Sequence, residues 1–246
     1  MAEKNNSLEK ALTVLDLFQD RARLTLTEAA QVTGFSNAAV SRILNTLESM
    51  HYIYQDRIDG GYYLTDKLFV LGRNTNLRNE IVNVIEEPIA ALCRNTGMSV
   101  SVSIRKDVHN ITVLRKDPQS GLALVANVGN SLSLNCTACG KVLTAFSRDY
   151  RDLVDRIHYV QLTKKTITDR DEFLALMEEV RSQKLAYDME EVTEGLVCVA
   201  VPVLAKDGIA ICAISISGYK DRMMRELYTL SVKLQDTAAV CEKLMQ

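Results

Sequence analysis

Two cysteines in C-x-x-C spacing, Cys136 and Cys139, are the residues of this sequence with the most obvious reactive chemistry. Such a pair can hold zinc or form a redox-active disulfide. A zinc finger needs a second pair at matching spacing, and the sequence contains none. Cys198 could join the pair in space. One hypothesis, an alternative to the function developed below, is therefore a metal- or redox-responsive regulator that uses Cys136, Cys139 and Cys198. We expect no metal and no cofactor.

Composition and motifs exclude several other classes of protein. The 246 residues are 47% hydrophobic and 24% charged, as in a globular protein and unlike a disordered one. The longest apolar runs fall far short of the roughly 20 residues of a membrane span. No nucleophile elbow, P-loop or dinucleotide fingerprint is present, so we expect no enzyme and no catalytic residue. Free cysteines and an N-terminus without a signal core predict a cytoplasmic protein with no membrane partner.

A second set of residues could read DNA. Val40, Leu44 and Leu47 form the apolar stripe of a predicted helix. The opposite face carries small or polar side chains and one arginine, namely Asn37, Ala38, Ser41, Arg42 and Asn45. Such a face can approach the major groove closely and hydrogen-bond to base edges. Arg42 can reach a phosphate or make a bidentate contact to guanine.

The surrounding elements would position this helix as in a winged helix-turn-helix. Ser7 is predicted to cap a first helix that ends near Phe18. Thr25 and Glu28 form a capping box that starts a second helix, which Gly34 ends. Ser36 then caps the third, and two β-prone runs, 52–55 and 62–64, form a hairpin with Arg57 near its turn. We predict a DNA-binding domain over residues 1–64.

The rest of the chain has the pattern of an α+β domain. Residues 98–104 alternate serine with valine or isoleucine, which predicts a half-exposed strand. Further strands are expected at 110–114, 122–125, 196–203 and 209–217, and helices at 172–184 and 221–244. This order predicts an antiparallel sheet flanked by helices, as in GAF-like sensing domains.

Two of these strands point to a small-molecule pocket. Ser215 and Ser217 share one face of their strand, and Cys198 and Ala200 share one face of its neighbour. The alternate valines of residues 197–203 are expected to pack against helices. Thr137 is predicted to cap a helix whose free amides could hold a carboxylate.

Several motifs in the N-terminal half resemble the winged helix-turn-helix of IclR-family transcriptional regulators. They are Ser7–Leu12, Leu26–Ala30 and Ala39–Leu47, followed by Tyr63-Leu64-Thr65 and Leu71-Gly72. The resemblance implies a linker helix over 65–80 and assigns Asn37, Ala38, Ser41, Arg42, Asn45 and Arg57 to DNA binding. Asn37, Ala38 and Ala39 depart from the Lys or Ser/Thr that relatives often carry there, so the operator sequence is not implied.

The C-terminal half, 81–246, is similar to the effector-binding domain of the same family. The matching motifs are Gly140-Lys141, Ala186–Glu191, Cys198–Val203 and Ser215–Gly218. The resemblance implies effector contacts by Ala138, Cys139, Asp188, Cys198, Ser215 and Ser217, and a small organic acid or aromatic carboxylate as effector. It also implies a homodimer or tetramer that acts as a repressor or activator. A ligand-binding module that does not bind DNA is the other alternative.

The net charge by itself does not indicate a DNA-binding protein. Residues 1–80 hold 9 Lys+Arg against 10 Asp+Glu, so this part is not basic. Few phosphates would be neutralised per subunit, and affinity must then come from a dimer on a palindromic double-stranded operator.

Overall fold

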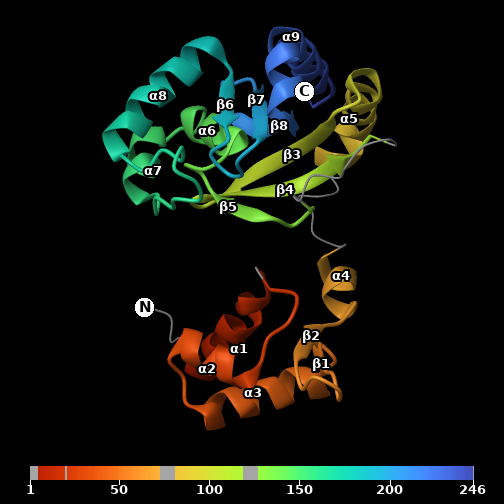
Figure 1. Cartoon of the computed structure of the whole chain (residues 1–246), viewed down its shortest axis with the longest axis vertical. Helices are drawn as coiled ribbons and strands as arrows, with labels where there is room; N and C mark the ends of the chain where they lie inside the picture. Colours follow the sequence, from red (N-terminus) through yellow and green to blue (C-terminus); the bar gives the residue numbers. More distant parts are fainter. Residues whose placement is uncertain (1–4, 20, 73–80, 119–126, 246) are drawn as a thin grey trace. The chain divides into compact units, whose positions relative to one another are not determined.

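The computed structural model describes residues 5–19, 21–72, 81–118 and 127–245. The chain divides into two compact units, Met1–Asn76 and Leu77–Gln246 (Figure 1). This division falls inside the segment 65–80, where the sequence places the linker. The predicted strand at 122–125 and residues 73–80 of the predicted linker helix lie outside the described residues.

The first unit is a winged helix-turn-helix. Its elements are α1 (Asn6–Asp16), a short 3-10 turn (Leu17–Gln19), α2 (Leu26–Thr33), α3 (Asn37–Ser49), β1 (Ile53–Gln55), β2 (Tyr62–Leu64) and α4 (Lys67–Gly72). One buried cluster joins the three helices to the hairpin and includes Val14, Leu24, Val40, Leu44 and Ile53. The apolar stripe of α3 therefore faces this core, and its polar face lies outside.

Local caps set both ends of α2 and the start of α3, as the sequence predicts. The Thr25 hydroxyl accepts from the Glu28 amide at 3.2 Å, and the Glu28 carboxylate accepts from the Thr25 amide at 2.7 Å. Gly34 ends α2 with φ +71°, a left-handed conformation that costs glycine little. Ser36 caps α3 by accepting from the Ala39 amide.

The start of α1 differs from the prediction. Asn5, and not Ser7, is the cap, because its side-chain oxygen accepts from the amides of Ser7 at 3.1 Å and Leu8 at 3.2 Å. The helix therefore begins earlier, at Asn6. Both residue types are good caps, and sequence spacing alone does not separate them.

The wing is held by one aspartate. Asp59 accepts from the Gly61 amide at 2.8 Å, the Tyr63 hydroxyl at 2.8 Å and Arg23 Nε at 2.7 Å. These donors hold the pKa of Asp59 below its usual range, at about 2. Arg23, which lies between the first two helices, thus holds the hairpin turn.

The second unit contains a six-stranded antiparallel sheet in the order β5-β4-β3-β8-β7-β6. The strands are β3 (Ser99–Lys106), β4 (His109–Lys116), β5 (Ser131–Ser133), β6 (Ala186–Met189), β7 (Leu196–Leu204) and β8 (Ala210–Tyr219). The helices are α5 (Asn83–Thr96), α6 (Ala138–Ala145), α7 (Tyr150–Arg156), α8 (Arg170–Gln183) and α9 (Lys220–Leu244). The antiparallel sheet with flanking helices is the predicted architecture.

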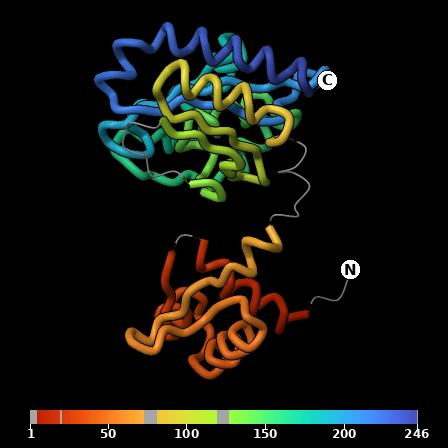
Figure 2. Tube along the Cα trace, turned by 90° about the vertical axis from the view of Figure 1, so that its right-hand side faces the viewer, coloured from red at the N-terminus to blue at the C-terminus, as the bar shows by residue number. Residues whose placement is uncertain are grey.

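Helices cover both faces of this sheet. On one face α5 and α9 lie side by side (Figures 1 and 2). The alternate valines of β7 pack against α9, as predicted, and α5 packs on β3 and β4. On the other face α6 packs over β7 and β8, and α8 packs on α6. Four elements are not predicted by the sequence patterns: α5, α7, β5 and β6. The strands among them have three and four residues, too few to show alternation, and α5 carries Pro88 inside it.

The serine face of β3 is buried, whereas the sequence predicts a half-exposed strand. Ser101 and Ser103 are only 7% and 2% exposed. The reason is the central position of β3, which pairs with β4 on one side and β8 on the other, while the N-terminal end of α6 and its loop close over the serines.

No helix in the described part of the chain combines the length and the hydropathy that a membrane span requires.

Candidate functional site

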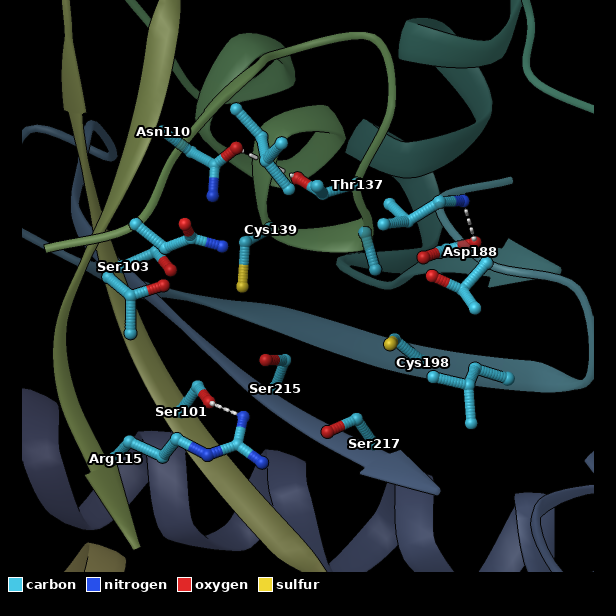
Figure 3. A pocket seen from close by; sticks show the side chains of 17 residues that line it. Ser101, Ser103, Asn110, Arg115, Thr137, Cys139, Asp188, Cys198, Ser215 and Ser217 are labelled. Carbon is cyan, nitrogen blue, oxygen red and sulfur yellow. Dashed lines mark hydrogen bonds between the residues drawn. The ribbon is translucent and has the colours of Figure 1, made fainter. Parts of the chain in front are cut away.

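A cavity of about 240 Å³ lies between the serine face of the sheet and the start of α6 (Figure 3). Side chains of all six strands of the sheet line it. All six residues predicted to bind an effector are in its lining: Ala138, Cys139, Asp188, Cys198, Ser215 and Ser217. The structure therefore brings together residues that are far apart in the sequence. Their role in binding stays a prediction.

Strand pairing explains this convergence. In the antiparallel register, Ser101 of β3 stands opposite Arg115 of β4 and Ser215 of β8. Cys198 of β7 stands opposite Ser217. Opposed residues project to the same face of the sheet, so these side chains share one wall of the cavity.

Arg115 is a lining residue that the sequence analysis missed. Its side chain is 7% exposed. Its Nε and Nη2 donate to the Asp117 carboxylate at 2.9 and 2.7 Å, and Nη1 lies 3.5 Å from the Ser101 hydroxyl. The predicted strand stops at residue 114, so the alternation was not followed to this arginine. The sequence analysis also did not assign Ser101 and Ser103 to this site. The strict alternation of serine along β3 was a signal for them.

The start of α6 forms a second wall. Thr137 caps the helix as predicted, because its hydroxyl accepts from the Gly140 amide at 2.8 Å. The same hydroxyl donates to the Asn110 side chain at 3.1 Å, which ties the helix start to β4. A Cβ on Gly140 would lie 2.3 Å from the Leu134 carbonyl oxygen, so the helix approaches the preceding chain closely.

Asp188 is the buried acid of the cavity. It is 3% exposed, and burial raises the pKa of its carboxyl to about 6, with the neighbouring Glu191 carboxylate as a further cause. Its Oδ1 accepts from the amides of Glu191 at 2.6 Å and Val192 at 3.4 Å, which oppose the rise. At neutral pH this side chain presents a hydrogen-bond acceptor to the cavity.

A buried ion pair stands behind Asp188. Lys141 of α6, 2% exposed, donates from Nζ to the Glu191 carboxylate and to the Tyr187 carbonyl oxygen. This pair fixes α6 to the end of β6. Glu191 Oε2 is the one buried side-chain oxygen or nitrogen among the described residues that lacks a hydrogen-bond partner.

The cysteines near the cavity are poor metal or redox groups. Burial raises the pKa of the Cys136 thiol to about 12, and it raises those of Cys139 and Cys198 as well. Thiols, unlike thiolates, are weak nucleophiles and weak metal ligands. In the parts of the chain that the structure describes, no three His, Cys, Asp or Glu side chains converge as a metal site would require. The metal- or redox-responsive alternative stays a prediction.

The predicted DNA-reading face lies on the outside of α3. Asn37, Ala38, Arg42 and Asn45 are exposed, and Ser41 is half-buried. Arg57 is exposed beside the wing tip, where Ile58 is 97% exposed. Within the described ranges, neither Arg42 nor Arg57 has a side-chain ion pair or hydrogen bond, in contrast to Arg23. Both guanidiniums are thus available to a nucleic acid, and their contact with DNA stays a prediction.

Comparison with known proteins matches both units. Residues 74–242 match a family model described as the C-terminal part of the bacterial transcriptional regulator IclR, and residues 7–57 match the IclR helix-turn-helix domain. The HTH-type transcriptional regulator KdgR of Escherichia coli (strain K12) is 29% identical over 236 residues, which cover 95% of this chain and 90% of KdgR.

Solved structures show the same architecture. An IclR transcriptional regulator from Alicyclobacillus acidocaldarius has a TM-score of 0.82 at 25% identity and covers 99% of this chain and 100% of its own. An IclR homologue from Microbacterium hydrocarbonoxydans, solved with 4-hydroxybenzoate, has a TM-score of 0.79, with 97% and 98% covered. Its identity is 15%, so this likeness concerns the fold alone.

Proposed function

Because its family matches span both units, this chain belongs to the IclR family of DNA-binding transcriptional regulators, and we propose that a small carboxylate held in the cavity modulates its operator binding. The protein acts in the cytoplasm as a homodimer or tetramer, as a repressor or activator. It requires no resident cofactor and carries out no catalytic step.

The observation that carries this proposal is the polar lining of the cavity. Hydroxyls, thiols, one guanidinium and one carboxyl converge on about 240 Å³ of space. Binding pockets for drug-sized ligands measure roughly 300–1,000 Å³, so this one suits a small metabolite. The Microbacterium homologue was solved with an aromatic carboxylate, and the present cavity offers groups suited to an acid in its own right.

Operator recognition would use α3 and the wing. Arg42 would supply the positive charge on a face of small or polar side chains, Asn37, Ala38, Ser41 and Asn45. Arg57 of the wing would contact the sugar-phosphate backbone of the DNA. A symmetric dimer would place two such helices on a palindromic double-stranded site. This arrangement explains how a unit without a basic composition can bind DNA specifically.

The test combines a thermal-shift screen with a DNA shift assay. Purified full-length protein is screened against small carboxylates, and each hit is added to an assay with the DNA upstream of the protein's own reading frame. A ligand at about 100 times its Kd adds about 2.7 kcal/mol to stability, which a melt detects readily. A hit is expected to change the affinity for DNA.

Serine variants locate the site. Ser215→Ala and Ser217→Ala are expected to reduce the ligand-induced shift, whereas Ser182→Ala on the exposed end of α8 should leave it unchanged. Unchanged shifts in both pocket variants would place the ligand elsewhere. A ligand-induced shift with no DNA binding under any condition would favour the ligand-binding module that does not bind DNA.

A further inference from the structure

The cavity has opposite charges at its two ends. Figure 3 shows Arg115 at one side and Asp188 at the other, with Ser215, Ser217 and Cys198 between them. An elongated ligand that fills the cavity must therefore present one end to a guanidinium and the other to a carboxylate.

The Arg115 end is preorganised to receive an anion. Asp117 holds the guanidinium through Nε and Nη2, and it also accepts from the Ser99 hydroxyl at 2.6 Å. Nη1 has only the long 3.5 Å approach to Ser101, so its donors remain for a ligand. Asp117 balances part of the positive charge, and a ligand carboxylate would bind through directed hydrogen bonds from Nη1 and the nearby serine hydroxyls.

The Asp188 end is unsuitable for a second anion. Lys141 is the cation near it, and its ammonium is already committed to Glu191 and to a backbone carbonyl. Glu191 adds a second carboxylate behind Asp188. The negative charge of Asp188 also acts on the first turn of α6. Burial is the main cause of the raised pKa of the Cys139 thiol, and the Asp188 carboxylate raises it further. A neutral hydroxyl, in contrast, can donate to Asp188.

We infer that the cavity binds its effector in one orientation, with a carboxylate at Arg115 and a hydroxyl at Asp188, and that it excludes dicarboxylates of the same length. This inference rests on the proposed function and narrows its ligand class to hydroxy-monocarboxylates. It also places the carboxylate at the end of the cavity away from Asp188, and not at the amides of α6. Arg115 and Asp188 are then the residues that determine specificity.

The experiment uses matched sets of ligands on full-length protein at pH 7.5, with binding measured by calorimetry and melting. Each set holds a hydroxy acid, the dicarboxylate, the unsubstituted acid and the primary amide of the hydroxy acid. Three frameworks are used: a four-carbon chain, a six-carbon chain and a benzene ring. On the framework that fits, the hydroxy acid should bind at least about tenfold more tightly than the dicarboxylate or the amide, a difference of about 1.4 kcal/mol.

Two variants test which residue binds each end of the ligand. Arg115→Gln should remove the preference for the acid over the amide. Asp188→Asn should remove most of the discrimination against the dicarboxylate, a gain that a merely structural role would not produce. Arg94→Gln, an exposed arginine on α5 outside the cavity, is the matched control and should behave as wild type. The wild-type comparison needs no variant, so it decides the point even if one variant fails to fold.

The outcomes separate this inference from the proposed function. No binding by any carboxylate would overturn the proposed effector class, and this inference with it. Dicarboxylates that bind as tightly as hydroxy acids would overturn the orientation alone, and so would an Arg115→Gln variant that still prefers the acid.

Discussion

The DNA-reading face and the effector cavity of this protein are built in different ways. The first lies on one helix, α3, whose exposed side chains follow each other within nine residues of the chain, from Asn37 to Asn45. The second collects buried and half-buried side chains from six strands and a helix start, from Ser101 to Ser217. A surface site thus depends on local helix geometry, whereas a buried site depends on strand register between distant segments.

The two sites also differ in what holds them. The side chains of the DNA-reading face of α3 are largely solvated, and changing them costs little folding energy. The cavity buries polar and charged groups, each of which needs a partner or destabilises the fold. Substitutions on the DNA-reading face of α3 should therefore alter binding alone, and substitutions around the cavity should alter stability as well.

The largest expected effect is the loss of operator binding in Arg42→Ala. One bidentate base contact is worth about 1–3 kcal/mol, and a dimer uses two, so affinity should fall at least about 30-fold. The melting temperature should stay nearly unchanged, because Arg42 is exposed. A shift assay and a melt measure both, with Arg94→Ala as control. A variant that binds its operator at wild-type affinity would contradict the assignment of α3.

Gly140→Ala should destabilise the effector unit. The added methyl group would lie 2.3 Å from the Leu134 carbonyl oxygen and 2.7 Å from its Cα, and this backbone cannot rotate away. We expect a loss of about 3 kcal/mol or more in the free energy of unfolding.

Gly218→Ala is the matched control for that substitution. Its methyl group would meet the end of the flexible Met98 side chain, so the loss should be smaller. Both variants are compared by denaturant titration. Equal losses would show that the close approach of α6 to the preceding chain does not limit the packing.

Asp188→Asn should stabilise the protein without ligand at neutral pH. Burial raises the pKa of this carboxyl from 3.8 to about 6, so the folded state favours its protonated form. The stabilising contribution of protonation is complete below pH 4 and is lost as the pH rises through 6. The groups around Asp188 are Glu191 of the following loop, Lys141 and Cys139 of α6, and Cys198 of β7.

The gain should be about 1–3 kcal/mol at pH 7.5 and should disappear near pH 4. Melting curves between these pH values measure it, with the exposed Asp152→Asn as control. A gain that does not depend on pH would mean that the charge of Asp188 is not its cause. A stabilised variant that responds poorly to hydroxy acids would show that the cavity retains a costly carboxyl for binding.

The smallest expected effect concerns salt. With 9 Lys+Arg against 10 Asp+Glu in residues 1–80, each subunit neutralises few phosphates. The slope of log K against log salt should therefore be shallower than the value of about −10 found for a strongly basic repressor. Shift assays between 50 and 200 mM salt measure it. A slope as steep as that would show that bulk charge, and not the α3 face, supplies most of the affinity.

The sequence by itself predicted the elements whose signals are local. The Thr25–Glu28 capping box, the Gly34 stop and the Ser36 cap each involve residues within four positions, and they determine where α2 begins and ends and where α3 begins. The alternation of valine in residues 197–203 likewise predicted the packed face of β7. The resemblance to a family then indicated six residues that do share one cavity.

Only the tertiary structure decided which groups surround that cavity and how they are charged. Ser101 is buried because β4 and β8 flank its strand, and Arg115 joins it through the β3–β4 register. The Lys141–Glu191 pair and the burial of Asp188 arise when α6 packs on β6. Caps and alternation depend on neighbours along the chain, whereas burial and pKa depend on neighbours in space, which are determined only when distant strands pair.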